Sequence, residues 1–205
     1  MLEIINIQSD DIVNLIKKQG EHLTSGQLSQ PRPSFEVRRK LSDILVKSLL
    51  PQVPDVSIRR HESGRPYLIS TTTEFLPHIS ISHSGSWIGI VLSPPDQYTT
   101  LDLEDMALPR SHQKIANNFF TEHEQLFFKE EGLIGFYKIW TAKEALAKNL
   151  DQTISSLLSV DIGRLLINRP LGTPFELYYC GHHFTLTQSI PEKTQSLMVT
   201  LCTRY

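Results

Sequence analysis

Hydrophobic residues recur at helical spacing in the segment SFEVRRKLSDILVKSLL, residues 34–50. The apolar positions include 37, 41, 44, 45, 49 and 50, so they form one stripe on a helix of 3.6 residues per turn. Ser34 is suited to cap the start of this helix, and Pro51 lies just beyond its end. The pattern predicts a helix over 34–50.

Short runs typical of strands follow this helix. They are VSIRRHE, HISIS and WIGIVL, with a turn at GRPYL, and then TTLDLED after the Pro94–Pro95 break. We expect a small antiparallel sheet beside the helix. The second half repeats this order, with helical stretches at 111–119, 122–131 and 136–150 and then the strand-like runs FELYYCG, HHFTLTQS and SLMVTLCTR.

Helices followed by an antiparallel sheet therefore occur twice along the chain. This order predicts an α+β fold of two similar halves, each an antiparallel sheet plus helix. We place the halves at residues 1–95 and 96–205 because the Pro94–Pro95 break and the segment around 93–101 interrupt the pattern.

Composition narrows the class of protein. The chain has 205 residues, of which 40% are hydrophobic, and a net charge of −2. Without a basic tail or stripe, the sequence favours neither a nucleic acid nor a membrane surface as partner. Acidic residues near the start and the lack of an 18-residue apolar run predict a cytoplasmic protein. Cys180 and Cys202 lie outside any CxxC pattern, which predicts free, buried thiols.

Two carboxylates stand one residue apart in TTLDLEDM. On a strand, Asp102 and Glu104 project from one face, whereas Leu101 and Leu103 project from the other. The pair is either the exposed side of a half-buried strand or a platform for a hard divalent cation, which takes oxygen ligands. Alternating polar residues alone favour the first interpretation.

Trp140, Glu144 and Lys148 lie four residues apart in IWTAKEALAKNL, so they share one stripe of the predicted helix. In the simpler interpretation, Trp140 anchors a core and Glu144 with Lys148 forms a helix-stabilising pair. The same spacing would also let a carboxylate complete a metal site while an ammonium group one turn away meets a phosphate.

Three further segments carry polar groups with more than one interpretation. Thr121 and Glu124 have the spacing of a capping box, which satisfies backbone amides at a helix start. Ser82 and His83 end a strand-like run, where they form a turn or donate to a phosphate. Arg65 is the cation of the GRP turn.

The order of these segments is more specific than any one of them. GRP, ISHSG, the D-x-E strand, FFTxxE and WxxKEAxxK, between about residues 35 and 150, together resemble the Sfp-type 4′-phosphopantetheinyl transferases. The resemblance implies two similar α+β halves with the active site in the cleft between them. It implies an enzyme that transfers the phosphopantetheine arm of coenzyme A to a serine of an acyl or peptidyl carrier protein, releasing adenosine 3′,5′-bisphosphate.

The resemblance also implies roles for residues of the second half. It implies that Asp102, Glu104 and Glu144 ligate Mg²⁺, and that Lys148 contacts the phosphates and steadies charge on the leaving bisphosphate. The serine must lose its proton to a carboxylate, for which Glu144 is the first candidate and Glu124 the second. A chain that contains both halves suggests a monomer.

In the first half, the resemblance implies that Arg38 and Arg65 hold the adenosine phosphates of coenzyme A. Ser82 and His83 match a pair that touches the 3′-phosphate region. Further basic residues upstream of the first helix, Lys17, Lys18 and Arg32, have no secure match. Thr100 stands where the family usually has a glycine, and its Cβ bears on how closely this strand approaches its neighbours.

Three other interpretations stay open. A binding module for coenzyme A or carrier proteins needs no catalytic groups, and retention of the three carboxylates and Lys148 argues against it. A metal-dependent phosphodiesterase uses a similar set of groups, but the near-neutral charge argues against a nucleic-acid substrate. Cys180, His182 and His183 are either ligands of a transition metal or a hairpin turn, and the turn is the simpler interpretation.

Overall fold

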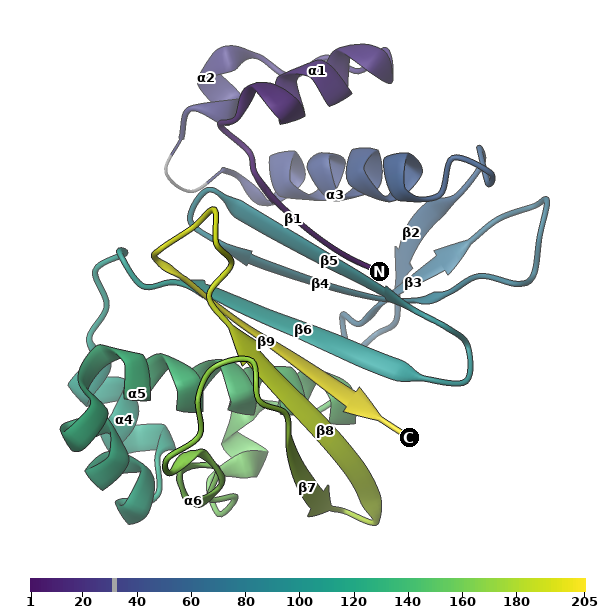
Figure 1. Ribbon diagram of the computed structural model, residues 1–205. Helices are drawn as coiled ribbons and strands as arrows, with labels where there is room; N and C mark the ends of the chain where they lie inside the picture. The colour runs from purple at the N-terminus through teal and green to yellow at the C-terminus, as the bar shows by residue number, and fades with distance from the viewer. Residues whose placement is uncertain (31–32) are drawn as a thin grey trace. The chain divides into compact units, whose positions relative to one another are not determined.

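The computed structural model describes residues 1–30 and 33–205, so Arg32 lies outside the described residues. The chain divides into two compact units, Met1–Asp96 and Gln97–Tyr205 (Figure 1). Each unit combines helices with antiparallel strands, which confirms the α+β class predicted from the sequence. The expected active-site cleft between the halves stays a prediction.

The first unit contains a three-stranded antiparallel sheet in the order β1-β5-β4. Its strands are β1 (Leu2–Asn6), β4 (His78–Ser84) and β5 (Trp87–Ser93). A separate hairpin pairs β2 (Ser57–Arg60) with β3 (Pro66–Ile69). The helices of this unit are α1 (Asp10–Lys18), α2 (Ser25–Leu28) and α3 (Phe35–Leu49). Helix α3 packs against both β2 and β5, so it joins the sheet to the hairpin.

Helix α3 confirms the helix predicted over 34–50. The Ser34 hydroxyl accepts a hydrogen bond from the Val37 amide at 3.3 Å and so caps the helix as expected. The apolar stripe is buried, with Leu41 0% and Ile44 2% exposed. Burial of this stripe fixes which side of α3 meets the core and which side, carrying Arg39, stays exposed.

Strand β1 and helix α1 are elements that the pattern of apolar residues did not predict. Strand β1 pairs with β5, and the nine-residue helix α1 buries Ile12 and Ile16 in the core of the first unit. Helix α1 has acidic residues in its first turn and basic residues in its last turn. This charge order favours a helix because it opposes the helix dipole, and it was the available signal.

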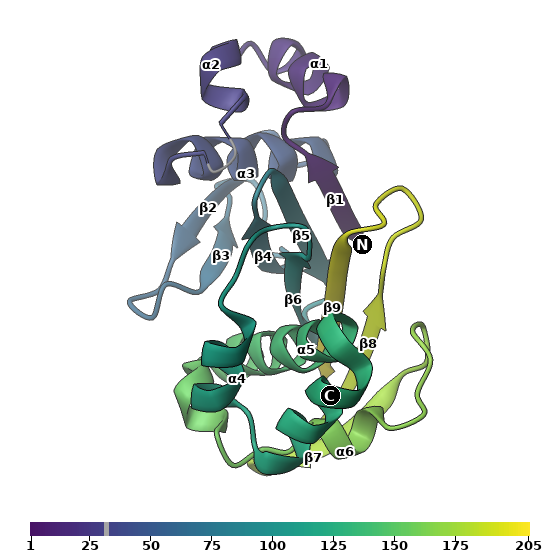
Figure 2. The same ribbon diagram turned by 90° about the vertical axis from the view of Figure 1, so that its left-hand side faces the viewer.

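The second unit contains a four-stranded antiparallel sheet in the order β6-β9-β8-β7 (Figure 2). Its strands are β6 (Tyr98–Asp105), β7 (Phe175–Tyr179), β8 (His182–Ser189) and β9 (Leu197–Arg204). The helical elements are α4 (His112–Phe119), α5 (Glu122–Leu150), the 3₁₀ turn η1 (Ile154–Leu157) and α6 (Gly163–Leu166). Helix α5 packs against β6 and β9 and so covers one face of the sheet.

Helix α5 contains both helices predicted at 122–131 and 136–150. The two parts meet at Gly132, which has a non-helical conformation with φ 62° and ψ −145°. Glycine adopts positive φ without the steric cost that a Cβ brings, which explains a sharp bend at this residue. The second part of α5 is largely buried and is the part that carries Trp140, Glu144 and Lys148.

A buried ion pair joins the two parts of α5 across this bend. The Lys143 ammonium lies 2.7 Å from the Glu124 carboxylate, and both side chains are 0% exposed. Glu124 also accepts hydrogen bonds from the backbone amides of Thr121 and Ile162, at 2.9 and 2.8 Å. Lys143 donates to the carbonyls of Phe119 and Leu157. Every charged group is therefore hydrogen-bonded, which a buried pair requires to be tolerated.

The CGHH segment forms the turn between β7 and β8. Cys180 and Gly181 have φ values of 51° and 77°, as a tight hairpin turn requires, so the hairpin interpretation is confirmed. Both cysteines are free, but Cys180 is exposed and only Cys202 is buried. The expectation that both thiols are buried was wrong for Cys180, because a turn between strands faces solvent.

None of the helices in the described part of the chain combines the length and apolar character needed to cross a membrane.

The buried pair gives a prediction about stability. We expect Lys143→Met to destabilise the protein by about 3–5 kcal/mol, because it leaves the Glu124 carboxylate buried without its cation. Urea unfolding followed by circular dichroism measures this change. The control is Lys40→Gln, which removes an exposed ion pair with Glu21 and should leave the urea midpoint unchanged. Equal stability of Lys143→Met and the parent protein would contradict the role given to the pair.

Candidate active site

The paired carboxylates of β6 face helix α5. Leu101 and Leu103 are buried on the opposite side of the strand, with exposures of 0% and 1%. Asp102 accepts a hydrogen bond from the Lys148 ammonium at 2.8 Å, and Glu104 accepts one from the Trp140 indole at 3.1 Å. The strand alternation expected from the sequence thus places both carboxylates against the stripe of α5.

Glu144 lies between these two contacts along the helix. It is one turn after Trp140, which bonds Glu104, and one turn before Lys148, which bonds Asp102. The stripe of α5 therefore brings a third carboxylate toward the two from β6. Trp140 itself packs in the core against Phe136 and Phe119, so it serves as core anchor and as hydrogen-bond donor to Glu104.

Arg110 completes the group of charges. It lies in the loop between β6 and α4, and its guanidinium donates to Glu104 at 2.6 Å. The guanidinium also lies over the Trp140 ring, 5.9 Å from its centroid. We call Asp102, Glu104, Glu144, Lys148 and Arg110 the carboxylate cluster. Sequence reasoning missed Arg110, because its contacts with Glu104 and Trp140 exist only in the folded chain.

The electrostatics of the cluster act most strongly on Glu144. Burial first, and the negative charge of Asp102 second, raise the pKa of its carboxyl from the ordinary value of 4.5 to about 7. Glu104 acts in the same direction, whereas Lys148 and Arg110 lower this pKa. Three carboxylates thus face two cations, and the third carboxylate ionises with difficulty.

Magnesium fits this cluster by donor type. Carboxylate oxygens are the ligands that Mg²⁺ takes, and the raised pKa of Glu144 shows that the cluster favours added positive charge. As the side chains stand, however, residues 1–30 and 33–205 contain no group of three or more His, Cys, Asp or Glu residues placed to hold a metal. Glu104 is bonded to Arg110 and Trp140, and Asp102 to Lys148.

Thr100, on the same side of β6, fastens the strand to α5. Its hydroxyl donates to the carbonyl of Ala145 at 2.7 Å, and the residue is 1% exposed. Ala145 directly follows Glu144 along the helix. The Cβ of Thr100 is therefore accommodated, and its hydroxyl ties β6 to the helix.

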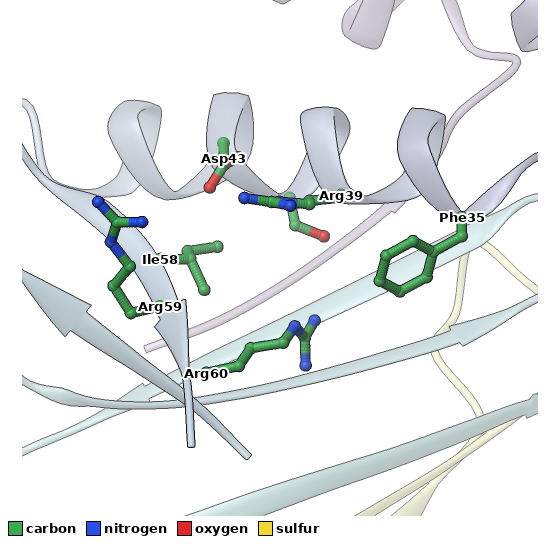
Figure 3. A pocket seen from close by; sticks show the side chains of 7 residues that line it. Phe35, Arg39, Asp43, Ile58, Arg59 and Arg60 are labelled. Atoms are coloured by element: carbon green, nitrogen blue, oxygen red, sulfur yellow. The ribbon is translucent and has the colours of Figure 1, made fainter. Parts of the chain in front are cut away.

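A pocket of about 250 Å³ lies in the first unit between α3 and β2 (Figure 3). Three arginines line it, Arg39 from α3 and Arg59 and Arg60 from β2, together with the side chains of Phe35, Ser42, Asp43 and Ile58. We call this site the arginine pocket. Burial raises the pKa of Asp43, the acid in this lining, so its negative charge is disfavoured. The pocket is therefore suited to an anion.

The arginine pocket adjoins one of the predicted site residues. The Ser42 hydroxyl, which lines the pocket, lies 3.4 Å from Nε2 of His83. His83 and Ser82 both belong to strand β4 rather than to a turn, and Ser82 is buried.

The two arginines predicted from the sequence do not line this pocket. Arg38 is the neighbour of Arg39 on α3, and a helix turns by about 100° per residue, so only one of them faces β2. Arg65 lies in the turn between β2 and β3, where its carbonyl accepts a hydrogen bond from the His61 amide. The Arg38-Arg39 and Arg59-Arg60 doublets were the available sequence signal.

Residues 101–202, which contain the whole carboxylate cluster, match the family model described as the 4′-phosphopantetheinyl transferase superfamily. Through this segment the chain belongs to the 4′-phosphopantetheinyl transferase superfamily. The matched residues begin at β6 and include both parts of α5, so the superfamily match and the packing of α5 on β6 concern the same part of the chain.

Two curated relatives agree with this placement in the superfamily. A Haemophilus influenzae protein, provisionally named as a 4′-phosphopantetheinyl transferase, is 29% identical over 107 residues, covering 50% of this chain and 44% of that protein. The Salmonella typhi 4′-phosphopantetheinyl transferase AcpT is 30% identical over 104 residues, covering 49% of this chain and 52% of that protein. The matches thus span about half the length of these relatives.

The raised pKa of Glu144 gives a prediction about pH. The folded protein binds this proton more tightly than the unfolded chain, so the resulting stabilisation is full below pH 4.5 and is lost as the pH rises through about 7. Glu144→Gln replaces the carboxyl with an uncharged amide, so the variant does not lose this stabilisation as the pH rises. We therefore expect the stability of the variant relative to the parent to increase between pH 5 and pH 8, by at most roughly 3 kcal/mol.

Urea unfolding at both pH values, in EDTA, measures this difference. The matched control is Glu130→Gln, which changes an exposed glutamate of the same helix. If the stability of Glu144→Gln relative to the parent is the same at pH 5 and pH 8, the cluster does not raise the pKa of Glu144.

Proposed function

We propose that this protein is a magnesium-dependent transferase that moves the 4′-phosphopantetheine arm of coenzyme A to a serine of an apo carrier protein. The observation that carries this proposal is the packing of α5 on β6, which gathers three carboxylates and two cations within the superfamily segment. The acyl or peptidyl carrier protein is the proposed partner. A monomeric, cytoplasmic enzyme is proposed with it.

The proposed reaction breaks a phosphoanhydride bond of coenzyme A and forms a phosphoester bond to the serine. The serine oxygen bonds to the phosphorus that carries the pantetheine arm, and the bond from that phosphorus to the bridging oxygen breaks. Adenosine 3′,5′-bisphosphate leaves with the electron pair of this bond, and the serine proton passes to a carboxylate. Such a transfer needs charge neutralisation and alignment more than covalent help from the protein.

The carboxylate cluster contains groups for each of these needs. Asp102, Glu104 and Glu144 are the proposed ligands of Mg²⁺, which when bound would neutralise charge on the diphosphate. Lys148, one turn from Glu144 and partly exposed, is proposed to steady the leaving phosphate. Glu144 is the proposed base, because it is partly exposed and lies on α5 between the residues that contact Glu104 and Asp102.

Glu124 receives a different role from the one that the sequence suggested as second choice. Its carboxylate is 0% exposed and is engaged by Lys143, Thr121 and Ile162. A base must reach the proton that it abstracts, and this carboxylate faces only the interior of the second unit. We therefore assign Glu124 to the structure of α5 and leave Glu144 as the base.

The arginine pocket is proposed to hold a phosphate on the adenosine side of coenzyme A. Guanidinium groups pair with phosphate through two parallel hydrogen bonds, and Arg39, Arg59 and Arg60 offer three such groups in one pocket. Arg38, Arg65, Ser82 and His83 remain candidates from the resemblance, and among them His83 lies beside the pocket through Ser42.

A binding module without turnover is the alternative that the site argues against most directly. Such a module needs no poised carboxyl, whereas Glu144 is held partly buried beside two other carboxylates at a cost in ionisation. A phosphodiesterase would release free phosphopantetheine or its equivalent without a carrier protein. One assay therefore separates the three functions.

Transfer to a carrier protein tests the catalytic assignments. With coenzyme A, Mg²⁺ and an apo-carrier protein, we expect phosphopantetheine on the carrier serine by mass spectrometry. Glu144→Ala and Lys148→Ala should each lower kcat by roughly 100-fold or more, because each removes charge compensation in the transition state. Exposed Glu130→Ala is the control. Coenzyme A binding without transfer to several carriers would favour the binding module instead.

The arginine pocket gives a separate prediction. We expect Arg60→Gln to raise the KM for coenzyme A by roughly tenfold, because one charge-assisted phosphate contact is lost. The KM for 3′-dephospho-coenzyme A should change much less. Lys193→Gln, which removes a charge from an exposed position of the second unit, is the control. An equal rise in KM for both substrates would place the 3′-phosphate elsewhere.

A further inference from the structure

Arg110 forms an ion pair with Glu104, whose carboxylate is a proposed ligand of Mg²⁺. Its guanidinium donates to Oε2 of Glu104 at 2.6 Å, while the Trp140 indole donates to Oε1 at 3.1 Å. Both oxygens of this carboxylate are therefore engaged by side chains of the second unit. The pair is mostly shielded from solvent, with side-chain exposures of 23% for Arg110 and 12% for Glu104.

A cation that binds to Glu104 has to compete with this contact. A guanidinium does not lose its charge at any working pH, so Arg110 can release Glu104 only by moving to another partner. The contact is short and charge-assisted, and partial burial reduces the screening by water. Arg110 thus lowers the affinity of the cluster for a divalent cation that arrives alone.

A diphosphate offers Arg110 that other partner. Phosphate oxygens accept two parallel hydrogen bonds from a guanidinium, as a carboxylate does. The guanidinium extends from the loop between β6 and α4 rather than from a helix or strand. A loop residue can change partner without disturbing β6 or α5, which hold the other members of the cluster.

We propose that Arg110 is an exchangeable counter-ion of Glu104: it lowers the affinity for Mg²⁺ alone and, when a diphosphate binds, turns to the phosphate and leaves Glu104 to the metal. This inference rests on the proposed function for its ligand class. Under this proposal each ligand increases the affinity for the other. The diphosphate draws Arg110 away from Glu104, and the metal takes the place of Arg110 at that carboxylate.

The test uses Arg110→Gln in a Trp87→Phe background, which leaves Trp140 as the one remaining tryptophan of the sequence. Its indole donates to Glu104, so its fluorescence reports on this carboxylate during a titration with Mg²⁺ alone. Isothermal titration calorimetry with the full chain gives the same Kd independently. We expect Arg110→Gln to bind Mg²⁺ roughly tenfold more tightly and inorganic pyrophosphate alone more weakly than the parent protein.

Two further variants make the result specific. Arg110→Lys keeps the charge, so its Kd for Mg²⁺ should stay within about twofold of the parent, and it serves if Arg110→Gln does not fold. Arg164→Gln removes an exposed arginine that pairs with Asp161 in the same unit, and its Mg²⁺ affinity should not change. Circular dichroism of each variant reports on folding.

An unchanged or weaker Mg²⁺ affinity in Arg110→Gln would overturn the inference, as would tighter binding in Arg110→Lys equal to that in Arg110→Gln. The carrier assay on the parent protein reports on the proposed function separately. If Arg110→Gln binds Mg²⁺ more tightly but the parent protein transfers no phosphopantetheine, the role of Arg110 as counter-ion stands and the proposed transferase function fails. If the parent protein transfers phosphopantetheine but Arg110→Gln leaves the Mg²⁺ affinity unchanged, the transferase function stands and the counter-ion role of Arg110 fails.

Discussion

The packing of helix α5 on strand β6 is the interaction on which the candidate active site depends. Side chains four residues apart on α5 meet side chains two residues apart on β6, so Trp140 reaches Glu104 and Lys148 reaches Asp102. These contacts put Glu144 among charges that its sequence neighbours alone would not provide. Its raised pKa is the direct electrostatic result of that packing.

A buried hydrogen bond and a buried ion pair hold α5 in this position. The Thr100 hydroxyl fixes the strand to the helix backbone next to Glu144, and the Glu124–Lys143 pair ties the start of α5 to its later part across the bend at Gly132. Lys143 and Glu144 are adjacent, so they project in different directions from one helix. Lys143 belongs to the buried ion pair and Glu144 to the carboxylate cluster, so neighbouring positions serve the core and the candidate site.

Charge pairing within the cluster also affects how a ligand would bind. Arg110 and Lys148 already neutralise Glu104 and Asp102, so neither a metal nor a phosphate meets an unengaged set of groups there. A ligand that carries both charges can exchange partners with the protein without leaving any charge uncompensated. This constraint favours a metal–diphosphate over either component, which suits the chemistry proposed for the superfamily segment.

Much of the fold followed from the sequence because periodicity is a local property. The spacing of apolar residues predicted α3 and most strands of both units, and strand alternation placed Asp102 and Glu104 on one face. The order of short motifs identified the superfamily to which residues 101–202 match. By contrast, β1 was missed because its partner β5 is distant in the chain, and pairing rather than local pattern makes it a strand.

Tertiary structure alone decided which charged side chains meet. Arg38 and Arg39 look equivalent in the sequence, but only Arg39 lines the arginine pocket, because the buried stripe of α3 sets the rotation of that helix. Packing likewise buries the Glu124 carboxylate in an ion pair with Lys143 and brings Arg110, which the sequence did not single out, into contact with Glu104. The sequence determines which chemical groups are available and their spacing along each element, whereas packing between distant elements determines their partners and therefore their charge.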